Sequence, residues 1–288
     1  MTSQTEAIYP APTRNFKGWG KYVALIALGV TLLLMLFPFG IVTINAFKSP
    51  ADYSGHGPMS LPTGIYLQGI IDFWNRVDFT GKLVNSAIIS ITVAILGVGL
   101  SLLNAFALGI GRVRGRIWFL VLFMMANTLP QEALAYPLYY FSKFLGIYNS
   151  QISVIIVFTV IQSAFGTYLL SSVFSAFPRE IIDAAMIDGC NKWQLLTKIV
   201  TPISMPTLAV LLVFFFIWTW NEFFLPMILL VSNTRWTVPL AIAILQGQHN
   251  MDATTSSASA LLGLLPCIIF FILFQRTLTQ GITAGSVK

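Results

Sequence analysis

Six long apolar stretches constrain this chain more than any other feature of its sequence. They cover residues 22–47, 84–110, 117–142, 151–176, 205–231 and 259–280. A helix needs roughly 20 apolar residues to cross the hydrocarbon core of a bilayer, and each stretch is long enough. The first stretch exceeds the apolar core of a signal peptide, which holds roughly 7 to 15 residues. We therefore expect an all-α integral membrane protein with six transmembrane helices.

The composition agrees with lipid as the solvent for most of the chain. Charged residues make up 9% of the 288 positions and hydrophobic residues 56%, whereas soluble domains contain about 25% charged residues. The two cysteines, Cys190 and Cys267, lack the spacing of a zinc site or a disulfide framework. We interpret both as packing residues.

The distribution of basic residues predicts the orientation. With the N-terminus in the cytoplasm, eleven of the sixteen basic residues fall on the cytoplasmic side. They are Arg14, Lys17, Lys21, Arg112, Arg114, Arg116, Arg179, Lys192, Lys198, Arg276 and Lys288. The outer side holds Lys48, Arg76, Lys82, Lys143 and Arg235. Cytoplasmic loops of membrane proteins are enriched in Lys and Arg, so both termini are expected in the cytoplasm, and the net charge of +6 needs no nucleic-acid partner.

One domain boundary follows from this pattern. Residues 1–21 are predicted to be a cytoplasmic N-terminal segment, and residues 22–288 a single six-helix domain. The outer connection, residues 48–83, contains an apolar and aromatic stretch from Ile65 to Trp74. This stretch fits either an amphipathic segment at the membrane interface or a packed cap.

The cytoplasmic stretch 177–204 is too polar to span a membrane and too apolar to be a plain loop. Pro178 is expected at the first helical position, and Glu180 and Asp183 favour the start of a helix. Gly189 can adopt the left-handed conformation that ends a helix. Asn191 can then cap a second helix from Lys192 to Val200, before Pro202.

The first of these helices has small and apolar side chains. Ala184 and Ala185 allow close approach of another surface, while Ile181, Ile182 and Met186 offer apolar contacts. An exposed helix of this kind fits a docking site for a partner protein. An amphipathic helix lying on the lipid surface is the alternative, and the residues alone do not decide between them.

Several motifs of this chain resemble those of ABC-importer permeases. Asp183-Ala-Ala-x-x-Asp-Gly189, followed by Ile199 and Pro202, is similar to the EAA signature through which these permeases contact their ATPase subunits. The wider resemblance is to the carbohydrate-uptake class of the maltose-transporter type, over roughly residues 20–288. Its other motifs are Asn85-Ser86, Gly111 to Arg116, Leu129 to Leu134, Pro137-Leu-Tyr, Phe177 to Glu180, Trp220 to Pro226 and Gly281 to Lys288.

The resemblance implies the smaller, six-helix permease of a heteromeric pair in a prokaryotic inner membrane. Its partners would be a second permease, two ATPase subunits and an extracytoplasmic sugar-binding protein. The expected contacts with the ATPase are Glu180, Asp183, Ala184, Ala185, Met186, Asp188 and Gly189. Asp183 stands where the family usually has glutamate, which retains the charge on a shorter side chain.

Residues for catalysis are missing from the sequence. The P-loop G-x-x-x-x-G-K-[S/T] is absent, as are H-E-x-x-H and G-x-S-x-G, and the histidines are His56 and His249. We therefore expect no enzyme activity and no bound cofactor in this chain, with ATP and Mg²⁺ held by the ATPase subunits.

Polar residues within the spans point to a translocation path, because ionisable groups in hydrocarbon usually face protein or water. The candidates are Asn127, Glu132, Gln162, Trp220, Asn221 and Glu222. Pro130 is expected to kink the third span next to Glu132, and Glu222 is expected in the middle of the fifth. Interhelical hydrogen bonding is the alternative role for each. A secondary transporter that uses Glu132 and Glu222 as ion sites is the alternative function.

Overall fold

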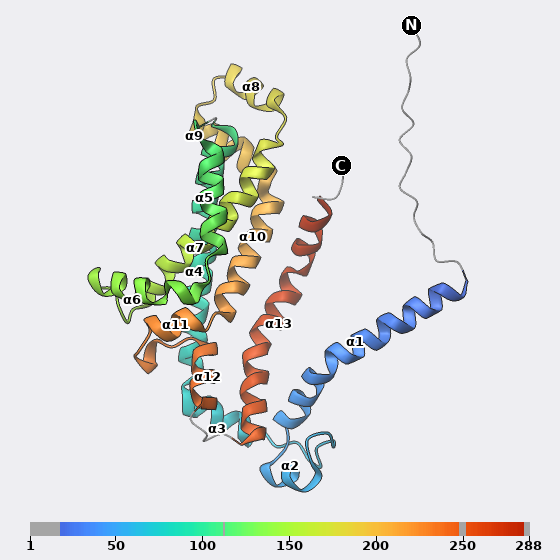
Figure 1. Ribbon diagram of the computed structural model, residues 1–288. Helices are drawn as coiled ribbons and strands as arrows, with labels where there is room; N and C mark the ends of the chain where they lie inside the picture. Colours follow the sequence, from blue (N-terminus) through green and yellow to red (C-terminus); the bar gives the residue numbers. More distant parts are fainter. Residues whose placement is uncertain (1–17, 112, 248–251, 285–288) are drawn as a thin grey trace.

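The computed structural model describes residues 18–111, 113–247 and 252–284 (Figure 1). Its long helices are α1 (Trp19–Ala46), α4 (Phe79–Ala105), α7 (Gln151–Ser175), α10 (Thr201–Asn221) and α13 (Ala253–Ala284). The shorter ones are α2 (Pro50–His56), α3 (Gln68–Val77), α5 (Arg116–Thr128), α6 (Ala135–Phe144), α8 (Arg179–Ile187), α9 (Lys192–Gln194), α11 (Phe224–Leu229) and α12 (Val238–Gly247). Two π-helical stretches, η1 (Phe106–Ile110) and η3 (Leu195–Val200), and two 3₁₀ turns, η2 (Gln131–Leu134) and η4 (Asn233–Arg235), complete the set.

The prediction of an all-α membrane protein is confirmed. Five helices of the described residues are long and apolar enough to cross a bilayer, and α5 with the segment Gln131–Phe144, a pair bent by 95°, brings the number to six when it is counted as one broken span. The bend lies at Leu129 and Pro130, which both have extended backbone. Proline has no backbone N–H, and it disfavours helical conformation in the residue before it. The kink expected at Pro130 is therefore a full break.

The core lies where α4, α7 and α10 pack together. Its buried side chains include Leu170, Phe174, Leu211 and Phe215. Gly166 of α7 permits this close approach, since an added Cβ there would lie 2.9 Å from the ring of Phe215. Small residues at such contacts let membrane helices pack through van der Waals forces, because lipid offers no hydrophobic drive between helices.

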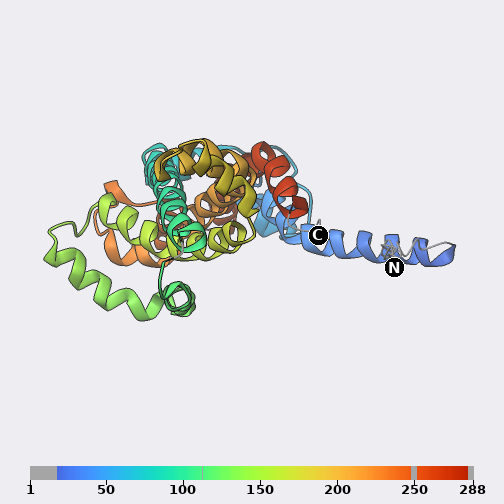
Figure 2. The same ribbon diagram turned by 90° about the horizontal axis from the view of Figure 1, so that it is seen from above.

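Helix α1 projects away from this bundle. Figures 1 and 2, which view the molecule at right angles, both show its far end standing clear of the other helices. Asn45 and Ala46, at the end beside α2, are its buried residues, and its most apolar stretch contains no buried residue. The end of α1 near α2 packs against α13, and the apolar far end, which has no neighbour within the described residues, must be covered by lipid or by another protein.

The fifth span differs from its prediction of residues 205–231. A continuous helix runs from Lys192 to Asn221, so the second helix of the 177–204 stretch does not end before Pro202. Pro202 falls in the first turn of α10, directly after the π-helical η3, where the hydrogen-bond pattern is already offset. The span then stops at Asn221, and α11 follows as a separate short helix.

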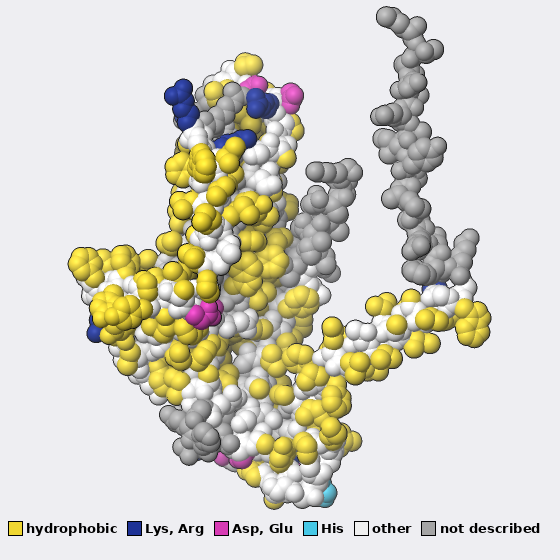
Figure 3. Space-filling view, viewed as in Figure 1, with side chains coloured by type: hydrophobic (Ala, Val, Ile, Leu, Met, Phe, Trp, Pro, Cys, Tyr) yellow, Lys and Arg dark blue, Asp and Glu magenta, His cyan; other side chains and the backbone are white. Residues whose placement is uncertain are grey.

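The two ends of the bundle differ in character. At the end formed by α8 and α9, the α8 end, Figure 3 shows Lys and Arg side chains gathered together. At the opposite end, the α3 end, Lys48 is fully buried and its Nζ donates hydrogen bonds to Gly57 O at 2.8 Å and Ser60 Oγ at 2.9 Å. Helix α3 packs through Phe73 and Val77, so the apolar stretch there is a packed cap on one face.

Candidate functional site

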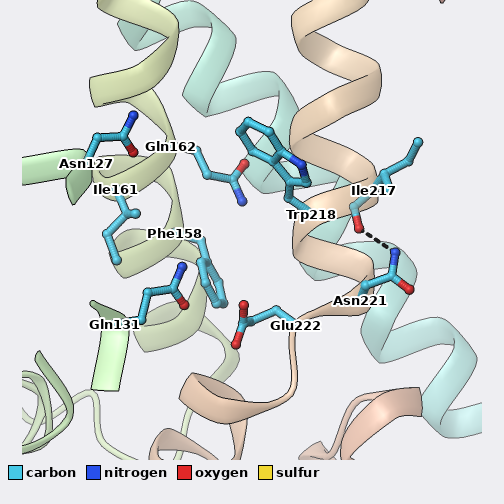
Figure 4. A pocket seen from close by; sticks show the side chains of 9 residues that line it. All are labelled: Asn127, Gln131, Phe158, Ile161, Gln162, Ile217, Trp218, Asn221 and Glu222. Atoms are coloured by element: carbon cyan, nitrogen blue, oxygen red, sulfur yellow. Dashed lines mark hydrogen bonds between the residues drawn. The ribbon is translucent and has the colours of Figure 1, made fainter. Parts of the chain in front are cut away.

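Two helix breaks meet beside the middle of α7 and enclose a pocket of about 360 Å³ (Figure 4). One break follows α5 at Leu129 and Pro130, and the other follows α10 at Glu222, where the backbone becomes extended. The pocket is lined by Asn127, Gln131, Phe158, Ile161, Gln162, Ile217, Trp218, Asn221 and Glu222. Polar side chains from three separate spans therefore meet in one cavity.

Four of the six residues predicted for a translocation path line this pocket. They are Asn127, Gln162, Asn221 and Glu222. Glu132 lies in the first turn of η2 and is exposed outside the lining. Trp220 is 4% exposed and stacks on Phe216, with the ring centroids 5.5 Å apart, so it belongs to the core.

The position of Glu222 and the role of Gln131 differ from the sequence analysis. Glu222 was expected in the middle of a span, but it caps the C-terminus of α10. Gln131 was not among the candidates, although it directly follows Pro130 and thus the break that opens the pocket. A polar residue next to a helix break was the available signal, because a break is where a membrane helix exposes polar backbone.

Gln162 is the most deeply buried polar group of the pocket, with 6% of its surface exposed. Its Nε2 donates to Thr219 Oγ1 at 2.8 Å, and Thr219 Oγ1 donates to Phe215 O at 2.8 Å. The Gln162 Oε1 atom has no hydrogen-bond partner. A buried acceptor without a partner is costly, so a donor that reached this atom would stabilise the protein.

Asn221 and Glu222 present oxygens at the second break. Asn221 Nδ2 donates to Ile217 O at 2.8 Å, and its Oδ1 accepts a hydrogen bond from Cys267 Sγ of α13 at 3.6 Å. Glu222 Oε1 accepts from the backbone N–H of Phe224 at 3.0 Å. No Lys or Arg lines the pocket, and Glu222 makes no ion pair within the described residues.

The chemistry of the pocket is that of binding. It combines hydrogen-bond acceptors with the indole of Trp218, which stacks against Phe214 at a centroid distance of 5.8 Å. Aromatic faces and acceptor oxygens together suit a polyhydroxylated ligand, whose hydroxyls are donors and whose C–H faces are apolar. Among the described residues, no group of three or more His, Cys, Asp or Glu is placed to hold a metal ion.

Helix α8 forms a second feature, at the α8 end of the bundle. Ala185 is 5% exposed and packs into the core, whereas Met186 and Ile187 are 58% and 85% exposed. Glu180, Asp183, Ala184, Asp188 and Gly189 are exposed as well. The two alanines therefore differ in exposure, and of the pair only Ala184 can contact another molecule directly.

The local geometry of α8 follows the sequence closely. Helix α8 begins at Arg179, so Pro178 is the capping residue rather than the first helical one. Gly189 has the expected left-handed φ of 81°, and the next N–H, that of Cys190, donates to Ala185 O at 3.0 Å. Asn191 caps the start of α9, as predicted, and forms a capping box with Gln194. These two caps fix the turn between α8 and α9.

A bundle of membrane helices with a polar pocket between two broken spans defines a membrane-embedded transport component. The chain belongs to the family of binding-protein-dependent transport system inner membrane components, whose family model matches residues 97–284. It is a multi-pass inner-membrane permease. The family does not support the alternative of a carrier driven by an ion gradient.

Named relatives extend over nearly the whole chain. The inner membrane ABC transporter permease protein YcjP of Escherichia coli is 29% identical over 263 residues, which are 91% of this chain and 94% of YcjP. The trehalose/maltose transport system permease protein MalG of Thermococcus litoralis is 28% identical, over 92% and 96% of the two chains. The diacetylchitobiose uptake system permease protein DasC of Streptomyces coelicolor is 28% identical, over 90% and 94%.

A solved structure has the same fold. It is the crystal structure of a bacterial ABC transporter involved in the import of the acidic polysaccharide alginate, with a TM-score of 0.78 and 21% identity. The match covers 93% of this chain and 99% of that one. The prediction of a permease fold from the EAA-like motif is confirmed.

Proposed function

We propose that this chain is one permease subunit of an ATP-driven importer that moves a sugar across the inner membrane. The observation that carries the proposal is the unpartnered Gln162 Oε1 in a pocket formed at two helix breaks. A hydroxyl of a sugar satisfies that acceptor, and Trp218 offers an apolar face to the ring. Names of relatives that transport trehalose or maltose and diacetylchitobiose support this substrate class.

In this proposal the pocket is a binding site for the sugar on the translocation path. Asn127 and Gln131 border the first break, and Asn221 and Glu222 border the second. Breaks allow the half-helices on either side to move separately, since no continuous hydrogen-bond ladder joins them. Alternating access then exposes the pocket to one side of the membrane at a time.

The α8 end is placed in the cytoplasm by this proposal, with both termini on that side. The basic residues at this end, such as Arg116, Arg179 and Lys192, support the orientation through the positive-inside rule. Residues 1–17 and 285–288, parts of the predicted terminal segments, lie outside the described residues. The chain from 22 onward then acts as a single membrane domain.

Helix α8 is proposed as the contact with an ATPase subunit that supplies the energy. Two observations favour docking over a helix lying on lipid: α8 stands beyond the ends of the spans (Figure 1), and its outer surface combines Ile187 with two exposed carboxylates. Those carboxylates, Glu180 and Asp188, would be repelled by an anionic lipid surface. Ala185 does not contact the partner directly, but it packs α8 against the core and so fixes the position of the helix.

The remaining partners fit the other exposed surfaces. Helix α1, with apolar side chains exposed between Trp19 and Phe39, offers a contact for a second permease. The loops at the α3 end would receive an extracytoplasmic sugar-binding protein, the kind of partner that the family description names. ATP and Mg²⁺ would be bound by the ATPase, and this chain would hold no cofactor.

Uptake by a reconstituted importer tests the proposal. The complete complex is reconstituted in liposomes, and ATP is supplied on the side of the membrane that carries the ATPase subunits. Transport of radiolabelled sugar to that side is measured after the ion gradients have been collapsed. Gln162→Leu removes the free acceptor and is expected to lower uptake at least tenfold. Gln246→Leu, at an exposed position of α12, is the matched control and retains uptake. Equal uptake by both variants, at equal amounts of protein, contradicts the proposal.

A further inference from the structure

A second pocket, of about 380 Å³, lies at the α8 end between α8 and the helix bundle. Three of its lining residues are cations: Arg116, Arg179 and Lys192. Asp183 is the one carboxylate in the lining, so the pocket carries two net positive charges. None of these four side chains forms an ion pair within the described residues, where the ion pair found is that of His56 with Asp52.

The depth of this pocket matches the headgroup layer of a membrane. Arg116 begins α5, and Lys192 begins the span that continues through α10. Ile110 and Ser175, also in the lining, are the last residues of the spans that end at η1 and α7. Four membrane-crossing helices thus terminate around one cavity, where hydrocarbon gives way to polar headgroups.

The wall of the pocket has an apolar part and a cationic part, which match the acyl chains and the phosphate of an anionic phospholipid. Phe106, Phe174 and Leu195 form an apolar lining and belong to the core or pack directly against it. The cations stand at the ends of the helices beside this apolar wall, at exposed positions. A free phosphate would fill the charged part alone, whereas an anionic lipid fills both parts.

We propose that this pocket binds the phosphate group of an anionic phospholipid from the leaflet at the α8 end. Arg116, Arg179 and Lys192 neutralise the phosphate, and the glycerol and the first acyl carbons lie against Phe106 and Phe174. Basic pockets between membrane helices bind acidic headgroups through this combination of charge and apolar contact. Because Ile182 and Met186 of α8 also line the pocket, the lipid supports α8 from the side of the bundle.

Native mass spectrometry of the full chain in detergent tests this site. Retention of phosphatidylglycerol is compared with retention of phosphatidylcholine, and inorganic phosphate is added as a competitor. The variant Arg116→Gln/Lys192→Gln removes two lining charges. The matched control Arg114→Gln/Lys198→Gln removes two exposed charges that lie outside the lining. Arg179→Gln, with one change outside any membrane span, provides a second variant, and thermal unfolding establishes that each variant is folded.

We expect the pocket variant to bind phosphatidylglycerol at least tenfold more weakly, and the control to stay within twofold of the original chain. Equal losses in the two double variants would overturn the proposal, because they indicate diffuse attraction by all basic residues. Displacement of the lipid by millimolar inorganic phosphate would identify free phosphate as the ligand instead. Loss of ATPase co-purification in the pocket variants, with unchanged lipid retention, would assign the pocket to the partner protein. The lipid measurement does not depend on sugar transport.

Discussion

Gln162 on α7 donates a 2.8 Å hydrogen bond to Thr219 on α10, and this bond leaves the Gln162 carbonyl oxygen free beside the pocket. The pair therefore joins two spans and orients the acceptor at the same time. Thr219 in turn donates to Phe215 O of its own helix. The position of the binding group thus depends on the packing of α7 against α10.

Replacement of Thr219 by valine is expected to destabilise the protein by about 0.5 to 2 kcal/mol, because it leaves the buried Gln162 Nε2 without an acceptor. Thermal unfolding in detergent measures the effect. Thr159→Val is the control, since the buried Thr159 hydroxyl has no partner to lose. A control variant as unstable as Thr219→Val would show that the bond between the helices contributes nothing.

Replacement of Gly166 by alanine is expected to destabilise the bundle by about 1 to 3 kcal/mol through overpacking. The new Cβ would meet the ring of Phe215 at 2.9 Å and the side chain of Ser101. Gly99→Ala on α4 is the matched control, because no atom lies within 4 Å of a Cβ there. The same unfolding assay compares the two, and identical midpoints contradict the packing described here.

Replacement of Gly189 by valine is expected to uncouple ATP hydrolysis from sugar uptake. A β-branched residue resists the φ of 81° at this turn, which sets the direction of α8. Asparagine tolerates that conformation, so Gly189→Asn is expected to retain most of the uptake. Both rates are measured in proteoliposomes, and normal uptake by the valine variant would contradict the docking role of α8.

The loop at the α3 end is expected to loosen in acid. A hydrogen bond from the backbone N–H of Thr63, at 3.0 Å, lowers the pKa of Asp52, and a contact with His56 lowers it further. A carboxyl group whose pKa is lowered by folding stabilises the fold above its unfolded pKa of about 4, and this contribution is lost as the pH falls through the lower folded value.

Hydrogen exchange of the Thr63 amide measures this effect. Protection is expected at neutral pH and is expected to fall progressively below about pH 4. Asp52→Asn is the control. After correction for the intrinsic exchange rate, the protection of the Thr63 amide in this variant should depend little on pH. An Asp52 protein whose loop stays equally protected in acid would show that the carboxylate does not hold the loop.

Local signals in the sequence were sufficient for much of this fold. The apolar lengths predicted six spans, Pro130 predicted a kink in the third span, and Gly189 and Asn191 predicted the turn after α8. Each of these features depends on a few neighbouring residues: a run of apolar side chains, a missing N–H, a left-handed glycine or a cap. Tertiary contacts do not alter them.

Other features depend on tertiary packing and could not be predicted. The helix continues through Pro202, whereas it breaks at Glu222, four residues before Pro226. The presence of a proline therefore does not predict where the helix ends. Ala184 and Ala185 are the same residue type, but the first is exposed and the second is buried. The packing of α8 against the core determines which face of the helix is buried. The meeting of Asn127 with Gln162 depends on the packing of α5 against α7.

The central claim is that the pocket between the two helix breaks lies on the path of the sugar. Asn127→Cys, in a chain whose native cysteines Cys190 and Cys267 are replaced by alanine, reports on this pocket through its rate of reaction with a membrane-permeant thiol reagent. In the full importer, we predict that sugar-loaded binding protein with ATP slows labelling at least fivefold, while Leu122→Cys, exposed on α5 outside the lining, is unaffected. An unchanged labelling rate at position 127 during active sugar uptake would contradict the account.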